Sequence, residues 1–342
     1  MIDDVLTRAG WDIGGAHVKL AYIEDNELFV HQWDCPLWKG LDELVSIIHK
    51  AKILIPESII NHHVTMTGEL VDVFISREQG VQEIMRVFFE QFPLDDNVRI
   101  FSRTGLVDHK TALLDTLSIA SANWIASGLC VGRNNDDIIF VDIGSTTTDV
   151  LSVKGGQLEL NGLSDFERLC TSELVYTGVV RSCVNTICQK IPYKGSFVPL
   201  MAEYFAVSAD IYRILGWLPD HADYGNTTDG QPKDKTSSMR RLARMIGEDY
   251  REQDKENWIS VAEYIAIQQM KMVEESIKNQ VKTHDDKPKI VGAGIGRFLI
   301  KKIANELLLD YQEFAQYIIP PGLNYDANCS DCAPAVALVF QS

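Results

Sequence analysis

Two stretches of the chain share one pattern of apolar and polar positions. Residues 11–31 predict a strand, a glycine turn, a returning strand, a polar turn and a third strand, and residues 138–160 repeat this order. Short apolar runs bounded by Gly, Asn and Asp are typical of buried strands joined by tight turns. The pattern predicts that each half of the chain begins with an antiparallel meander and that the halves are related domains.

Apolar residues at helical spacing, with strand-like runs between them, account for most of the remaining chain. The predicted helices are residues 41–51, 80–92, 116–127, 206–217, 237–247, 258–282, 297–308 and 333–340, and the further strands are residues 52–55, 64–66, 98–101 and 289–291. The polar residues 218–235 predict a long loop. This alternation predicts an α/β fold with domains at residues 1–132 and 136–332, a boundary near residues 128–137, and C-terminal residues 333–342 that can pack on the first domain.

The turn after residue 143 carries the clearest candidate chemistry. A glycine ends the apolar run, hydroxyl side chains follow it, and an acid stands on either side. Backbone N–H groups and hydroxyls suit phosphate oxygens, whereas carboxylates suit Mg²⁺, which keeps several waters and contacts protein through one or two acids. The residues predicted to act here are Asp142, Gly144, Ser145, Thr146, Thr147 and Asp149. Taken alone, a solvated hairpin is the alternative.

Two further glycine turns repeat this logic. One turn follows an acid near the N-terminus, and the other precedes the helix predicted at residues 297–308, whose positive end can hold phosphate. The residues predicted to bind phosphate are Gly14, Gly15, Lys19, Gly292, Gly294 and Gly296. Asp12 occupies the same place in the first half as Asp142 in the second, so both are predicted to hold Mg²⁺. A single G-x-G is a weak signal, but the recurrence strengthens it.

Other polar side chains are candidate substrate contacts. Glu69 follows a predicted strand end, where a helix start is the alternative interpretation. Glu173, Tyr176 and Arg181 fall within about two helical turns, and Arg181 is predicted to grip phosphate through its planar guanidinium unless it forms a salt bridge with Glu173. Asp229 lies in the long polar loop, and such loops often bind ligands.

The predicted helix at residues 237–247 is basic on one side. Arg240 and Arg244 lie one turn apart, on a face that could reach a diphosphate. The same predicted helix also carries Arg241. A solvated basic face explains the same spacing.

Composition narrows the classes of partner. The 342 residues include 32 Lys and Arg against 48 Asp and Glu, which gives a net charge of −16 and a pI near 4.9. Such a chain lacks the clustered positive charge that a duplex nucleic acid or an anionic membrane needs. An anionic small molecule must therefore be held by local devices. Apolar runs fall short of the roughly 18 residues of a membrane span.

The cysteines and adjacent histidines argue against resident metal clusters. Seven scattered cysteines are typical of a reducing cytoplasm. Cys329 and Cys332 have zinc-ligand spacing, but a second pair is missing from the sequence around them. His62 and His63 point to opposite faces of a strand, so a shared metal is not expected.

Several longer stretches together resemble the hydantoinase/oxoprolinase-related family linked to tetrahydromethanopterin-dependent one-carbon transfer. They are residues 12–16, 65–70, 121–126, 142–149, 173–179, 229–230 and 240–247. The resemblance runs from about residue 11 to the C-terminus. It implies two duplicated ribonuclease-H-like domains of the acetate and sugar kinase, Hsp70 and actin type (ASKHA) around a central cleft.

The resemblance also implies an activity, because a characterised family member is the condensing enzyme of methanofuran biosynthesis. That reaction joins γ-glutamyltyramine, a phenolic amine, to an aminomethylfuran-methyl diphosphate and releases diphosphate. On this model Asp142 or Asp149 is base or cation ligand, residues 145–147 hold diphosphate, and the first turn forms the opposing wall with Arg181 assisting. His17 departs from the small polar residue expected in that turn.

Two other functions stay open on the residues alone. An ATP-dependent small-molecule kinase would use the same turns with Mg²⁺ on the transferring phosphoryl group. A non-catalytic nucleotide-binding regulator would use them without turnover. Whether ATP binds, and whether the protein is a homodimer, is left open by the sequence.

Overall fold

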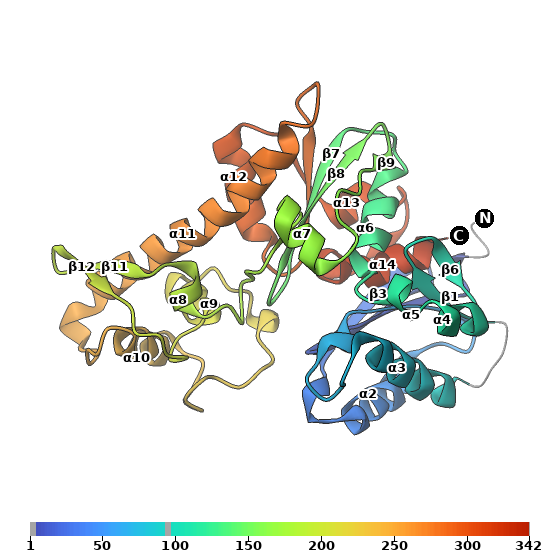
Figure 1. Cartoon of the computed structure of the whole chain (residues 1–342), viewed down its shortest axis with the longest axis horizontal. Helices are drawn as coiled ribbons and strands as arrows, with labels where there is room; N and C mark the ends of the chain where they lie inside the picture. Colours follow the sequence, from blue (N-terminus) through green and yellow to red (C-terminus); the bar gives the residue numbers. More distant parts are fainter. Residues whose placement is uncertain (1–4, 93–96, 342) are drawn as a thin grey trace. The chain divides into compact units, whose positions relative to one another are not determined.

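A computed structural model describes residues 5–92 and 97–341 (Figure 1). The chain forms two compact units. The first contains residues 1–136, 155–158 and 313–342, and the second contains residues 137–154 and 159–312. The first unit includes residues 313–332, which the sequence analysis assigned to the second domain, because a short strand at Asn324–Tyr325 pairs with the strand Glu27–Asp34.

The first unit is built on a mixed sheet with the strand order β15-β3-β2-β1-β4-β5-β6. Its strands are β1 (Arg8–Ile13), β2 (His17–Glu24), β3 (Glu27–Asp34), β4 (Asn61–Met66), β5 (Val98–Ser102), β6 (Gly105–Val107) and β15 (Asn324–Tyr325). β1, β2 and β3 form the predicted antiparallel meander, and β4 runs parallel to β1. A polar turn at Asp25 and Asn26, both with positive φ, joins β2 to β3.

Helices cover this sheet on both faces. They are α2 (Leu41–Leu54), α3 (Arg77–Gln91), α4 (His109–Leu114), α5 (Thr116–Ile119), α6 (Asn123–Gly132), α13 (Phe314–Ile318) and α14 (Ala333–Phe340), with short turns η1 (Leu37–Lys39), η2 (Gly68–Leu70) and η5 (Cys329–Cys332). α2 buries Leu44, Ile47, Ile48 and Ala51, the i, i+3, i+4, i+7 stripe of an amphipathic helix. α14 lies against β1 so closely that a Cβ at Gly10 would meet the Ala335 carbonyl oxygen at 1.9 Å.

His62 and His63 lie on opposite faces of β4, as predicted. The His62 ring packs among Trp11, Phe88 and Phe92, and its Nδ1 accepts a hydrogen bond from Trp11 Nε1 at 3.2 Å. His63 Nδ1 instead lies 2.9 Å from the Leu338 carbonyl oxygen of α14. The two rings therefore lie in separate layers of the core and have different hydrogen-bond partners.

Burial of His62 makes the stability of the first unit depend on pH. Burial, then the charges of His63 and Lys52, lowers the His62 pKa from 6.5 to about 4. The unfolded chain therefore binds this proton more tightly than the folded chain between pH 6.5 and 4, so stability falls as the pH drops through that window. We expect a loss of about 2 kcal/mol between pH 7 and pH 5, measured by urea unfolding.

A His62→Asn variant is the control for this prediction. Asparagine keeps a carbonyl acceptor for Trp11 but does not titrate. Its unfolding free energy should change between pH 7 and pH 5 by about 2 kcal/mol less than that of the unmodified protein. Equal pH dependence of the two proteins would show that His62 is not the group responsible.

The second unit has its own sheet, with the strand order β10-β8-β7-β13-β14. Its strands are β7 (Ile138–Ile143), β8 (Thr148–Lys154), β10 (Leu174–Val175), β13 (Lys289–Ala293) and β14 (Tyr311–Glu313); β9 (Gln157–Leu158) follows β8 in the chain, and β11 (Lys190–Tyr193) pairs with β12 (Ser196–Pro199) as a hairpin. β7 and β8 are antiparallel, and β13 is parallel to β7. The order of strands thus repeats the centre of the first sheet.

Helices of the second unit include a long central one. They are α7 (Asp165–Thr171), α8 (Val184–Ile187), α9 (Ser208–Leu215), α10 (Lys235–Arg244), α11 (Lys255–Val281) and α12 (Arg297–Leu307), with short turns η3 (Asp220–Ala222) and η4 (Glu252–Asp254). α11, orange in Figure 1, packs on β7 and β8 and also contacts α9 and α10. Ile139, Val141, Trp258 and Ile265 belong to one buried cluster.

Three sequence-based boundaries were wrong. Residues 52–54 continue α2 instead of starting a strand, and residues 116–127 are divided between α5 and α6. α6 extends to Gly132, so the predicted linker begins inside a helix. Residues 173–181 form the short strand β10 followed by an irregular segment, in which Gly178 packs closely against neighbouring backbone.

Candidate functional site

The turn that follows β7 is tight and partly exposed. The Gly144 N–H donates to the Thr147 carbonyl oxygen at 2.9 Å, which closes residues 144–147 into a bend between β7 and β8. Ser145, Thr146 and Thr147 are half-buried. This bend, called the anion loop below, has the composition of a site for phosphate oxygens.

A second segment supports the anion loop from one side. The Val179 N–H donates to the Gly144 carbonyl oxygen at 3.1 Å, and the Arg181 N–H donates to the Ser145 carbonyl oxygen at 2.9 Å. A Cβ at Gly178 would lie 2.5 Å from the Ser145 carbonyl carbon and the Thr146 nitrogen. The absence of a side chain at Gly178 is therefore what allows the two segments to meet.

These contacts set the direction of the loop's N–H groups. In a planar trans peptide the carbonyl and the following N–H point in opposite directions. Since the Gly144 and Ser145 carbonyls point at residues 179–181, the N–H groups of Ser145 and Thr146 point away from that segment. Among the described residues, no backbone carbonyl accepts from either N–H. Successive N–H groups aimed one way form an anion-binding concavity.

The third glycine turn lies directly beside Asp142. Gly294 has φ +81°, and a Cβ there would lie 2.3 Å from Asp142 Oδ1 and from the Ile143 carbonyl oxygen. The Gly296 N–H donates to the same Ile143 carbonyl at 2.9 Å. The structure therefore brings Asp142, the anion loop and residues 294–296 together within the second unit.

Gly292 does not belong to that turn. It lies within β13, where a Cβ would meet the Tyr311 ring at 2.6 Å. Packing against Tyr311 is sufficient to explain the glycine. The predicted contact between Gly292 and phosphate has no support in this geometry.

Asp149 is engaged in a buried ion pair. It stands directly opposite Asp142 in the β7–β8 register, where two like charges would destabilise the sheet. Arg168, 1% exposed, offsets this repulsion with a 2.7 Å bond from Nη2 to Asp149 Oδ1. An acid held in this way is poorly suited to be a general base.

Glu173 is a structural residue. It is fully buried, and Oε2 accepts from Thr171 Oγ1 at 2.6 Å while Oε1 accepts from the backbone and side chain of Asn161. Its predicted contact with substrate is not supported, because the carboxylate is enclosed by its own loop. Tyr176 and Arg181, by contrast, are exposed, and both lie in or next to the segment that supports the anion loop.

The first unit contains a similar bend after β1. The Gly14 N–H donates to the His17 carbonyl oxygen at 2.8 Å, and Gly68 packs on Gly14 much as Gly178 packs on the anion loop. Asp12 is buried and stands opposite Lys19, whose Nζ lies 4.0 Å from Asp12 Oδ2. In the first unit the cation thus lies next to the leading strand acid, whereas in the second unit Arg168 contacts Asp149 of the following strand.

Glu69 is a buried acid that contacts two other segments of the first unit. It is 1% exposed, and its Oε1 accepts from Ser121 Oγ at 2.7 Å. Gly80 of α3 packs on the Glu69 backbone. The expectation that Glu69 contacts substrate is not supported, because the carboxylate is enclosed between η2 and the residues before α6.

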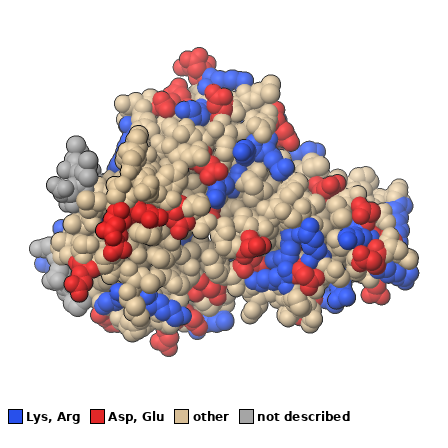
Figure 2. All heavy atoms as spheres, turned by 180° about the vertical axis from the view of Figure 1, so that it is seen from behind, with Lys and Arg blue, Asp and Glu red and all other residues tan. Residues whose placement is uncertain are grey.

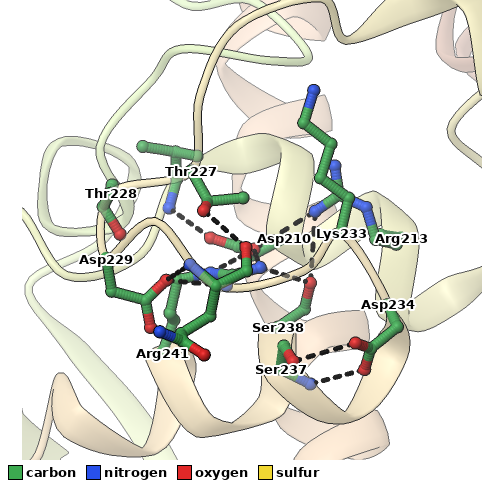
Figure 3. A network of polar contacts seen from close by, with 12 residues as sticks. Asp210, Arg213, Thr227, Thr228, Asp229, Lys233, Asp234, Ser237, Ser238 and Arg241 are labelled. Carbon is green, nitrogen blue, oxygen red and sulfur yellow. Dashed lines mark hydrogen bonds and ion pairs between the residues drawn. The ribbon is translucent and has the colours of Figure 1, made fainter.

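Asp229 is bound by two arginines, of which Figure 3 labels Arg241. Its Oδ1 accepts from Arg241 Nη1 at 3.0 Å, and its Oδ2 accepts from Arg244 Nη1 at 3.1 Å. Burial acts to raise the pKa of Asp229, but the Gln231 N–H and the two guanidinium groups hold this pKa below its ordinary value. Asp229 thus fixes the loop at residues 218–235 to α10, and its predicted contact with substrate is not supported.

Arg241 is the centre of this network, and sequence reasoning missed it. It is fully buried, and its Nη2 lies 2.7 Å from Asp210 Oδ1. Asp210 also accepts a hydrogen bond from the Val207 N–H and so caps α9. Arg213 contacts Asp210 and lies 2.6 Å from Asp223, so it links the two acids. The only sequence signal was the acid at the third helical position of α9, which is typical of a cap.

The charges of this region are balanced locally. Figure 2 shows acidic and basic side chains next to one another in several places on one face of the molecule. Lys233, for example, lies 3.4 Å from Asp223. The predicted diphosphate contact by Arg244 competes with its bond to Asp229, whereas Arg240 is exposed.

The oxygen donors beside the anion loop fit a magnesium ion. Asp142 and the three hydroxyls would supply hard oxygen ligands to a bound Mg²⁺, the kind of donor that this ion prefers. In the described part of the chain, no group of three or more His, Cys, Asp or Glu side chains could hold a metal.

Cys329 and Cys332 are buried, and Cys329 Sγ contacts the Leu28 carbonyl oxygen. Burial raises the pKa of Cys329, so its thiol stays protonated.

Comparison with known proteins identifies the family. The hydantoinase/oxoprolinase family model matches residues 61–325, which include β4, the anion loop and the third glycine turn. The chain belongs to the hydantoinase/oxoprolinase family. The resemblance seen in the motifs is confirmed.

Two curated relatives carry the same name. A protein of Methanocaldococcus jannaschii is 29% identical over 299 residues, covering 87% of this chain and 88% of that protein. A protein of Methanococcus vannielii is 34% identical over 184 residues, covering 52% of this chain and 79% of that protein. Both are named (4-{4-[2-(γ-L-glutamylamino)ethyl]phenoxymethyl}furan-2-yl)methanamine synthase.

The fold of this chain is similar to that of a larger solved protein. The nucleotide-free structure of acetone carboxylase matches with a TM-score of 0.54 at 10% identity, over 97% of this chain and 70% of that one. The predicted α/β fold of duplicated ribonuclease-H-like domains is thereby confirmed. Within the described residues, no helix is long and apolar enough to cross a membrane.

Proposed function

We propose that this protein is a transferase that forms the aryl ether named in its two relatives. The "phenoxymethyl" group in that name is a phenol oxygen bonded to the CH₂ of a furan. The simplest disconnection gives γ-glutamyltyramine, whose phenol is the nucleophile, and an aminomethylfuran whose CH₂ carries a leaving group. The agreement of this name across both relatives is the observation that carries the proposal.

The second unit provides a suitable site for a diphosphate leaving group. The outward N–H groups of Ser145 and Thr146 stabilise negative charge that develops on the departing oxygen. Arg181, exposed next to the loop, adds a guanidinium that pairs with phosphate. A bound Mg²⁺, held by Asp142 and the diphosphate oxygens, would supply further charge neutralisation.

The reaction balances with two substrates and no redox step. The C–O bond between CH₂ and diphosphate breaks, the diphosphate keeps the electron pair, and the electron-rich furan stabilises positive charge on CH₂. The phenol oxygen then bonds to CH₂, and its proton passes to the diphosphate or to water. The protein's task is to orient the CH₂ carbon and exclude water that would otherwise react there.

Diphosphate release from defined mixtures tests this proposal. Purified protein is incubated with Mg²⁺, γ-glutamyltyramine and aminomethylfuran-methyl diphosphate, and both diphosphate and the ether are measured. We expect both products only when both organic substrates are present. Formation of ADP from ATP and either organic substrate would instead support a kinase, and no turnover in any mixture would support a regulator.

We also propose a cytoplasmic location and place the activity in methanofuran biosynthesis. The seven cysteines are free thiols, which a reducing compartment preserves. The substrates are small and polar, so a membrane or nucleic-acid partner is not required by the reaction.

A further inference from the structure

Gln269 is a buried polar residue in the apolar face of α11. It is 1% exposed and lies among Ile265, Ala266, Met270 and Val273, which are also buried. An amide in such surroundings is unfavourable unless all its polar atoms are hydrogen-bonded. Its presence therefore calls for specific partners.

The partners of Gln269 are in the segment that supports the anion loop. Its Nε2 donates to Thr177 Oγ1 and to the Gly178 carbonyl oxygen, both at 2.8 Å. Its Oε1 accepts from the Tyr212 hydroxyl of α9 at 2.6 Å. Gln269 Nε2, the donor atom of the amide, must face Gly178, because a carbonyl oxygen accepts hydrogen bonds and cannot donate them. Tyr212 is fully buried, and burial raises its pKa.

Two further bonds hold the same segment. Thr148 Oγ1, at the start of β8, donates to the Thr177 carbonyl oxygen at 2.7 Å. The Gly178 N–H donates to Ser182 Oγ at 2.8 Å. Hydrogen bonds from α11, from β8 and within the segment therefore hold residues 177–182 in place. The same segment contains the N–H groups of residues 179–181 that donate to the anion loop carbonyls.

We propose that Gln269, oriented by Tyr212, is a positioning residue for diphosphate binding. It does not touch the ligand. It holds Gly178 in place, so that residues 179–181 keep the Gly144 and Ser145 carbonyls turned inward and the Ser145 and Thr146 N–H groups turned outward. The same segment places Arg181 next to Ser145. This inference rests on the anion-binding role proposed above.

Gln269→Met is the principal test variant, and Gln280→Met is its matched control. Methionine keeps the length of the side chain but leaves the Gly178 carbonyl without its donor. Gln280 is a buried glutamine on the same helix, 3% exposed, outside the Thr177 to Gly178 network. The probe is inorganic diphosphate with Mg²⁺, and its affinity is measured by titration calorimetry.

We expect diphosphate affinity to fall about tenfold in Gln269→Met and to change less than twofold in Gln280→Met. In turnover assays, KM for the furan diphosphate should rise while KM for γ-glutamyltyramine stays unchanged. Folded Gln269→Met protein with wild-type diphosphate affinity would overturn the inference, and so would equal effects of the two variants.

Tyr212→Phe keeps the inference testable if Gln269→Met does not fold. This change removes one hydroxyl and retains the ring, and we expect diphosphate affinity to fall by about threefold. Folded Tyr212→Phe with unchanged affinity would count against the inference. If unmodified protein binds diphosphate but forms no ether, the proposed function fails and the inference stands. If unmodified protein does not bind diphosphate at all, both fail.

Discussion

Replacing Asp142 with asparagine is expected to lower turnover at least about 100-fold while the protein stays folded. The side chain is half-buried beside the anion loop and Gly294, and asparagine fits the same space. The substitution removes a negative charge without creating a cavity. The melting temperature should therefore change by no more than about 3 °C.

Asp149→Asn is the matched control, because the two acids stand opposite each other in the β7–β8 register. Losing Asp149 leaves Arg168 buried with a weaker partner, so this variant should lose stability. The two acids are thus expected to separate into one that affects catalysis and one that affects folding. Equal turnover of Asp142→Asn and the unmodified protein would contradict the role assigned to Asp142.

The Mg²⁺ dependence of Asp142→Asn distinguishes a cation ligand from a general base. If Asp142 holds the cation, the Mg²⁺ concentration for half-maximal residual activity should rise severalfold, and excess Mg²⁺ should restore part of the rate. If it is the base for the phenol, the Mg²⁺ requirement should stay unchanged and the acid limb of the pH–rate profile should disappear. We expect the first result, because Asp142 lies beside Gly294 and the anion loop, where we propose that diphosphate binds.

The strands and turns of the site could be predicted from the sequence. β7 and α14 begin and end where the apolar runs predicted, because a buried strand or helix must be apolar and a turn residue must end it. The sequence analysis grouped Asp142 and Gly294 because the glycine-turn pattern recurs. The structure supplies the physical reason that they meet, since β7 and β13 are parallel neighbours and their carboxyl ends lie at one edge of the sheet.

The partners of the charged residues could not be predicted in the same way. Arg168 pairs with Asp149, and Gln269 binds Gly178, across sequence separations of 19 and 91 residues. A sequence pattern reports which face of an element is apolar, but it does not report which polar group on another element meets it. Asp149, Glu173 and Asp229 therefore resembled ligand contacts until their internal partners were known.

Replacing Arg241 with methionine is expected to destabilise the second unit by about 3–5 kcal/mol. Arg241 is fully buried and binds Asp210 through Nε and Nη2 and Asp229 through Nη1 (Figure 3). Methionine matches its length but leaves Asp210, 2% exposed, with fewer partners. An anion left in low dielectric without full compensation is the source of the expected loss.

Arg244→Met is the control for Arg241→Met, because Arg244 contacts the other oxygen of the same Asp229 carboxylate. The Arg244 side chain is 51% exposed, so its removal should cost less than about 1 kcal/mol. Urea unfolding measures both variants, and hydrogen exchange over residues 208–244 locates the effect. Faster exchange in this region for Arg241→Met alone would establish that the network holds the long loop to α9 and α10, and similar losses for both arginines would show that burial does not set their contributions.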